Sequence, residues 1–142
     1  MERNLPVSGI TFIYFEHYEE SCRALREGFG FEEAIDYGYA KLYRTAEHCF
    51  VGAVNRGQVT KRVAPDKGVT ICMTHPSRES LQQRHDDLAA RGMNPPDVAK
   101  SKRLSYYSFT MQGPEGYRFE FGTFVDPNEA ALLNPPPTFS RE

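Results

Sequence analysis

Apolar and polar positions alternate along the first third of the chain in patterns that predict a strand, a helix and three further strands. Residues 8–15 are apolar on both faces, which is typical of a strand covered on both sides. Apolar residues then recur at helical spacing, at Tyr18, Cys22, Leu25 and Phe29. Two strands are predicted over residues 33–39 and 40–45 with a turn at Gly38, and a third over residues 49–54.

The same order of patterns returns after residue 67. A strand begins at Gly68, Ser77 is the expected N-cap of a helix, and Gly92 fits its C-terminal end. An ungapped alignment with an offset of 59 residues (68 − 9) places Gly9 on Gly68 and Ser21 on Ser80, with the further matches Thr11 on Thr70 and Glu20 on Glu79. We interpret this similarity as an internal duplication.

Residues 106–124 predict a β-hairpin, because strand-forming residues flank the turn-forming run Gly-Pro-Glu-Gly at residues 113–116. A loop of those residues alone would pair Phe109 with Glu120. One face of the hairpin would then carry Tyr107, Phe109, Met111, Arg118 and Glu120, and the other Phe119 and Phe121. Glu120 is then either a solvated carboxylate or a carboxylate inside an aromatic cavity, where it must be paired, protonated or bound to a metal.

Composition narrows the class of protein. The 142 residues predict one domain or two halves that share one core, and the formal net charge of −2 argues against general binding to nucleic acid or anionic membranes. No apolar run resembles a signal peptide or a membrane span. The three cysteines match neither a zinc site nor a disulfide framework, so we expect a cytoplasmic protein.

We expect a first repeat over residues 7–55, a polar linker over 56–67, a second repeat over 68–125 and a Pro-rich tail over 126–142. Pro135, Pro136 and Pro137 exclude regular structure from their part of the tail. Leu132 and Leu133 are the residues that would dock this tail onto the body or onto a second subunit.

Two βαβββ repeats in one short chain resemble the vicinal oxygen chelate superfamily, which includes glyoxalase I, extradiol dioxygenases and bleomycin-resistance proteins. Residues 113–121 (GPEGYRFEF) are similar to the family's Asp-Pro-x-Gly turn followed by a strand with an inward glutamate, although Gly113 replaces the aspartate. Residues 29–31 (FGF) are similar to the Leu-Gly-Phe that ends its first helix. The resemblance, over residues 7–125, implies an α+β fold of curved mixed sheets with the helices outside, and a homodimer.

Metal-using members of the superfamily hold a divalent cation with histidines and glutamates from several strands. The corresponding positions fall near Gly9, Gly52 and Gly68 and at Glu120, and only Glu120 offers a ligand. One carboxylate cannot hold a tight divalent site, so we expect no conventional metal site and no cofactor. A divalent metal stays an alternative if His17 or His75, at the ends of equivalent strands, completes a site; His48 falls in a turn and His85 on the second helix.

The glycines would instead leave room for an organic ligand. By strand parity, the expected pocket is lined by Thr11, Ile13, Phe50, Val54, Thr70, Cys72, Phe109, Met111 and Arg118, beside Tyr107 and Glu120. The alternative is that these side chains fill one another's space and leave no cavity.

Three functions remain open. The leading one is a metal-independent protein that binds a small apolar or aromatic molecule. The second is a lyase, isomerase or dioxygenase with Glu120 as metal ligand or general base and Tyr107 as acid or hydrogen-bond donor. The third is an interaction module that uses the tail and the loop of residues 56–67.

Overall fold

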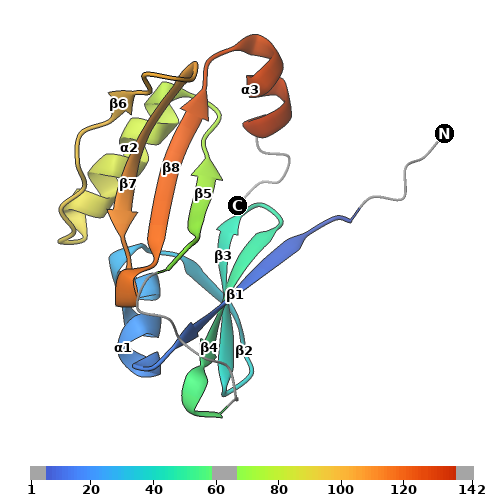
Figure 1. The fold of residues 1–142 in the computed structure, drawn as a ribbon, viewed down its shortest axis with the longest axis vertical. Helices are drawn as coiled ribbons and strands as arrows, with labels where there is room; N and C mark the ends of the chain where they lie inside the picture. Colours follow the sequence, from blue (N-terminus) through green and yellow to red (C-terminus); the bar gives the residue numbers. More distant parts are fainter. Residues whose placement is uncertain (1–5, 59–66, 137–142) are drawn as a thin grey trace.

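The structure is a computed structural model, and it describes residues 6–58 and 67–136. The first half has the predicted order of elements, which are β1 (Gly9–Phe15), α1 (Tyr18–Arg23) with a π-helical turn (Ala24–Gly28), β2 (Glu32–Asp36), β3 (Ala40–Ala46) and β4 (Cys49–Asn55), before a 3-10 turn at Arg56–Gln58. The second half repeats it with β5 (Thr70–Thr74), α2 (Arg78–Ala90), the short β6 (Ala99–Lys100), β7 (Tyr106–Gln112), a 3-10 turn (Pro114–Gly116) and β8 (Arg118–Phe124), and α3 (Pro127–Leu133) follows (Figure 1). The predicted α+β fold of two βαβββ units is confirmed.

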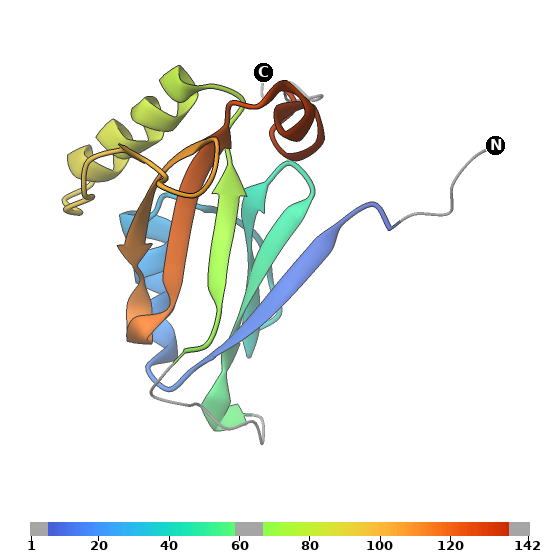
Figure 2. The ribbon, with the colours of Figure 1, turned by 45° about the horizontal axis from the view of Figure 1, so that its top comes forward.

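Each half forms a four-stranded mixed sheet, with strand order β1-β4-β3-β2 in the first and β5-β8-β7-β6 in the second. The first strand of each half runs parallel to the last strand, and the remaining pairs are antiparallel. Figures 1 and 2 show α2 along one side of the second sheet and α3 beyond the end of β8. Each sheet has a helix along one side, which we call the helix side. None of the described helices covers the other side, which we call the open face.

The two halves share one hydrophobic core on the helix side of both sheets. Phe29, at the end of the π-helical turn, lies with its ring centroid 4.8 Å from that of Phe119 and 6.4 Å from that of Phe121. Phe15 in β1 contacts the Tyr117 ring edge-on at 5.3 Å. Because these rings are buried and come from both halves, neither half has a core of its own.

The structure corrects the offset of the internal repeat by one residue. His17 is the N-cap of α1 and Ser77 is the N-cap of α2, which gives an offset of 60 residues (77 − 17). The same offset places buried Ile13 of β1 on buried Met73 of β5. The ungapped offset of 59 is therefore wrong, since it would pair side chains that lie on opposite faces of their sheets.

The hairpin register is also corrected by one residue. Gln112 pairs with Arg118 and Thr110 pairs with Glu120, so Tyr117 belongs to the loop. The loop adds this residue because Glu115 has a positive φ of 55° inside the 3-10 turn, and the Gly113 amide donates to the Tyr117 carbonyl. The prediction that Phe109 faces Glu120 is wrong.

The segment predicted as an irregular tail contains α3, which Asp126 caps by accepting from the Glu129 amide. Buried Asn134 docks this helix, since its side-chain oxygen accepts from the Phe124 amide at 2.9 Å. Of the two leucines predicted to dock this segment, Leu132 is 78% exposed and Leu133 42%, so Leu132 does not dock it within the chain, and docking onto a second subunit stays a prediction. Pro135 and Pro136 lie outside regular structure as predicted, and Pro137 lies outside the described residues.

Candidate functional site

Glu120 lies at the middle of β8, on the open face of the second sheet. The register places it between Cys72 of β5 and Thr110 of β7. Its Oε2 accepts from the Tyr106 hydroxyl at 2.7 Å and from the Cys72 thiol at 3.6 Å, and its Oε1 accepts from the Thr110 hydroxyl at 3.3 Å. The carboxylate is therefore half-buried and held by neutral hydrogen-bond donors from two neighbouring strands.

Tyr106 is the residue that fixes this arrangement. Its ring lies across Gly122, where a Cβ atom would stand 1.9 Å from the phenol oxygen, and it packs on Phe124 with centroids 4.4 Å apart. Burial, followed by the hydrogen bonds with Cys72 and Glu120, raises the pKa of the Tyr106 phenol. Sequence reasoning named Tyr107 instead, and the signal that points to Tyr106 is Gly122, since it alone leaves space for the ring.

Cys72 completes the cluster as a protonated thiol. Cys72 keeps part of its surface exposed, but desolvation by the surrounding side chains is the main cause that raises the pKa of its thiol, and the nearby charge of Glu120 acts in the same direction. The thiol also lies 3.3 Å from the Tyr106 hydroxyl. Because a thiol is a nucleophile only as the thiolate, this environment favours a donor role for Cys72 over a nucleophilic one.

Only some of the predicted pocket residues of the second half share this face. Thr70, Cys72 and Arg118 lie on the open face with Glu120. Tyr107, Phe109 and Met111 pair with Thr123, Phe121 and Phe119 and lie on the helix side. The predicted grouping of Glu120 with these aromatic residues is therefore wrong, and the cause is the register of the hairpin.

The first half separates its predicted pocket residues in the same way. Phe50 and Val54 share the open face with Gly52, whereas Thr11 and Ile13 share the helix side with Val51 and Ala53. The open face has no free space at Gly52, because a Cβ there would stand 2.5 Å from the Phe12 ring. At this strand the side chains therefore fill one another's space and leave no cavity, which is the predicted alternative to a pocket.

The donor atoms on the open faces do not fit a divalent metal. Within residues 6–58 and 67–136, no three His, Cys, Asp or Glu side chains lie close enough together to hold an ion. His17 is an exposed helix cap, His48 is exposed in its turn, and His85 packs edge-on against Phe109 at 5.3 Å. His75 follows β5, and its Nδ1 is 3.0 Å from the Ser80 hydroxyl.

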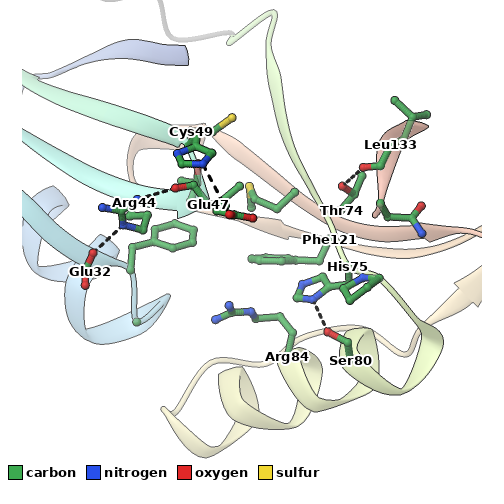
Figure 3. A pocket seen from close by; sticks show the side chains of 18 of the residues that line it. Glu32, Arg44, Glu47, Cys49, Thr74, His75, Ser80, Arg84, Phe121 and Leu133 are labelled. Carbon is green, nitrogen blue, oxygen red and sulfur yellow. Dashed lines mark hydrogen bonds and ion pairs between the residues drawn. The ribbon is translucent and has the colours of Figure 1, made fainter. Parts of the chain in front are cut away.

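A cavity of about 840 Å³ lies between the two halves, and His75 is among the residues that line it (Figure 3). Its walls are the β3–β4 hairpin, the segment from the end of β5 into α2, and the end of α3. Figure 3 shows Arg84 of α2 and Arg44 of β3 at the cavity from opposite halves. None of the residues predicted to line a pocket contributes to it.

Comparison with known proteins places this architecture. No family model matches the sequence, and no curated protein matches it either. A glyoxalase/bleomycin resistance protein/dioxygenase from Nocardioides superposes with a TM-score of 0.70 at 11% identity, over 98% of this chain and 93% of that one. The chain has the glyoxalase/bleomycin-resistance/dioxygenase fold.

Two further structures agree with this assignment. A lactoylglutathione lyase from Agrobacterium tumefaciens gives a TM-score of 0.65 at 12% identity, over 85% of this chain and 96% of that one. A glyoxalase-related enzyme from Fulvimarina pelagi gives 0.63 at 14% identity, over 84% and 88%. The resemblance predicted from the sequence is thus confirmed for the glyoxalase-type fold, and none of the described helices is long and apolar enough to cross a membrane.

Proposed function

We propose that this glyoxalase-type chain is a small-molecule binding protein whose ligand contacts Glu120 on the open face of the second sheet. The observation that supports this proposal is the arrangement around Glu120. The buried Tyr106 phenol holds one carboxylate oxygen at 2.7 Å, and the side chain stays half-exposed. A carboxylate positioned in advance of binding loses little conformational entropy when a ligand arrives.

The chemistry of the open face defines the kind of ligand. A carboxylate recognises an ammonium group or a hydroxyl donor, and exposed Thr70 and Thr110 lie beside it. Ile10 and Phe12 are exposed on the open face of the first sheet and suit an apolar or aromatic body. We propose an amine or alcohol with an aromatic part, and a second copy of the chain that closes the open faces around it.

A thermal-shift screen tests the proposal with a panel of aromatic amines, aromatic alcohols and matched neutral ethers. We expect amines to raise the melting temperature of the wild type, and Glu120→Gln to remove most of that shift because it removes the charge. Glu79→Gln is the matched control, since Glu79 is exposed in the first turn of α2. A panel that produces no shift, or a shift equal in Glu120→Gln, would refute a Glu120-centred site.

The hydrogen bond from Tyr106 also favours a second candidate, a lyase or isomerase with Glu120 as general base. In this candidate Tyr106 takes the donor role that the sequence assigned to Tyr107, because only Tyr106 reaches Glu120. The two functions differ in one result: an enzyme would lose turnover in Glu120→Gln while it still binds a neutral substrate. Metal content by mass spectrometry, in wild type and Glu120→Ala, tests whether a divalent ion contributes.

A further inference from the structure

The cavity between the two halves has the features of a second binding site, and Glu120 is not among its lining residues. It holds about 840 Å³, which is within the range of small-molecule pockets. Its lining is partly charged and partly aromatic, and it comes from segments of both halves (Figure 3). A ligand there would contact the hairpin of the first half and the helix of the second.

Three arginines and two carboxylates line the described part of this cavity. Arg84 of α2 lies with its guanidinium carbon 5.7 Å from the centroid of the Phe121 ring. Arg44 faces it from β3, where it donates to Glu32 at 2.7 Å and to the Glu47 carbonyl at 2.6 Å. Asp87 lies beside both arginines of α2, since it accepts from Arg91 at 3.0 Å and lies 3.9 Å from Arg84.

Ser80 in the first turn of α2 and His75, just after β5, add hydrogen-bonding groups without a further charge. The Ser80 hydroxyl and His75 Nδ1 lie 3.0 Å apart and both line the cavity. Burial and the positive charge of Arg84 lower the pKa of His75 to about 4, so its ring is neutral at pH 7. The Ser80 hydroxyl therefore lies beside a neutral imidazole and one helical turn before Arg84.

The floor of the cavity is apolar. Phe121 and Met73 line it from the second sheet, and Phe31 lines it from the first half. Phe121 is fixed from behind, because its ring stacks on Phe109 with centroids 5.2 Å apart. A rigid aromatic floor next to a guanidinium group suits a flat ligand with an anionic end.

We propose that this cavity binds a small organic carboxylate, with Arg84 and Ser80 at the carboxylate and Phe121 and Met73 against its apolar body. The carboxylates of Glu32, Glu47 and Asp87 balance the charges of the three arginines, so the cavity has no excess positive charge and suits a single negative charge better than a phosphate dianion. An inorganic ion would make no favourable contact with the apolar floor, so an organic ligand fits the cavity better. This site is independent of the proposal for Glu120.

An NMR titration of the ¹⁵N-labelled full chain tests the proposal with benzoate and phenylacetate as probes. Benzamide and inorganic phosphate serve as the neutral and the inorganic comparison. We expect benzoate and phenylacetate to shift the amide signals of residues 80–84 and 44–49, and to bind at least about tenfold more tightly than benzamide, because the charged hydrogen bonds are lost in the amide.

Variants identify the side chains. Arg84→Gln should weaken carboxylate binding by about tenfold or more, and Arg84→Lys and Ser80→Ala should weaken it less. Arg78→Gln is the matched control, since Arg78 lies on the same helix but over the Tyr107 ring at 3.9 Å, outside the cavity. Glu120→Gln should leave carboxylate binding unchanged, which separates this proposal from the first.

Three results would overturn the proposal. They are equal affinity for benzoate and benzamide, a preference for phosphate over both carboxylates, and an equal loss of binding in Arg84→Gln and Arg78→Gln. If Arg84→Gln fails to fold, Arg84→Lys and Ser80→Ala replace it in the test. Wild-type affinity for benzoate in both of these variants would also contradict the proposal.

Discussion

Glu115 binds the segment that leads into α1, a helix in the other half of the chain. Its carboxylate accepts from the backbone amides of Glu16 at 3.0 Å and His17 at 2.8 Å, and from the Ser21 hydroxyl at 3.0 Å. His17, the N-cap of α1, makes no side-chain capping bond of its own. One carboxylate from the β7–β8 loop thus binds the amides of the two residues before α1 and a hydroxyl within α1, and joins the two halves.

We expect Glu115→Gln to lower the free energy of unfolding by about 0.5–2 kcal/mol at pH 7, because its three hydrogen bonds lose their charged acceptor. Partial burial raises the pKa of Glu115, but the hydrogen bonds from Glu16, His17 and Ser21 outweigh it, and the pKa is lowered overall. A lowered pKa stabilises the folded state above the ordinary carboxyl pKa, and that stabilisation is lost as the pH falls through the folded pKa.

Urea denaturation between pH 7 and pH 2.5 measures this effect. The difference between wild type and Glu115→Gln should be largest at neutral pH and should shrink in acid. Glu20→Gln is the control, because Glu20 lies exposed in the first turn of the same helix. A difference that stays constant with pH would mean that the Glu115 charge does not contribute.

At the scale of elements, the sequence predicts well what short segments decide locally. The strand predicted over residues 49–54 is β4 (Cys49–Asn55), and Ser77 caps α2 by accepting from the Ser80 amide at 3.0 Å. A cap and a strand pattern depend on neighbouring residues, so they can be inferred without the rest of the fold.

The hairpin register could not be predicted because a distant contact decides it. Glu115 has a left-handed backbone conformation that a non-glycine residue rarely adopts, while its side chain bonds to α1. The loop therefore includes Tyr117, and every following side chain changes face relative to β7. For this reason Glu120 meets Tyr106 and Thr110, and the predicted cavity of aromatic residues does not form around it.

Gly52 and Gly122 lie on the open faces under aromatic rings, and substitution of each by alanine tests how firmly its ring is held. Gly122→Ala should destabilise the chain by about 1–3 kcal/mol, because the new Cβ meets the ring of Tyr106, which is only 5% exposed and bonded to Glu120. Gly52→Ala should cost less, because the Phe12 ring over Gly52 is 51% exposed and free to turn outward. Chemical denaturation midpoints of both variants measure the difference, and equal costs would contradict the fixed position of Tyr106.

In the whole molecule the core lies between the two halves, and the open faces of both sheets point outward. The open face of the second sheet carries Glu120, and that of the first sheet carries exposed apolar side chains. The helix side of both sheets is buried in one cluster that includes Phe15, Phe29 and Phe121. Two apolar side chains of β1 on the open face of the first sheet are left exposed, Ile10 at 44% and Phe12 at 51%. Neighbouring exposed apolar side chains of this kind mark an interaction surface, and we propose that a second copy of the chain covers it.

Analytical ultracentrifugation of two matched variants tests this arrangement. Phe12→Lys places a charge on the open face of the first sheet and should convert a dimer into a monomer, because an interface core does not accept an unpaired charge. Leu132→Lys changes an equally apolar side chain, 78% exposed on α3, and should leave the dimer intact. A monomer for Leu132→Lys with a dimer for Phe12→Lys would move the interface to α3, and a monomeric wild type would show that one chain alone holds the site around Glu120.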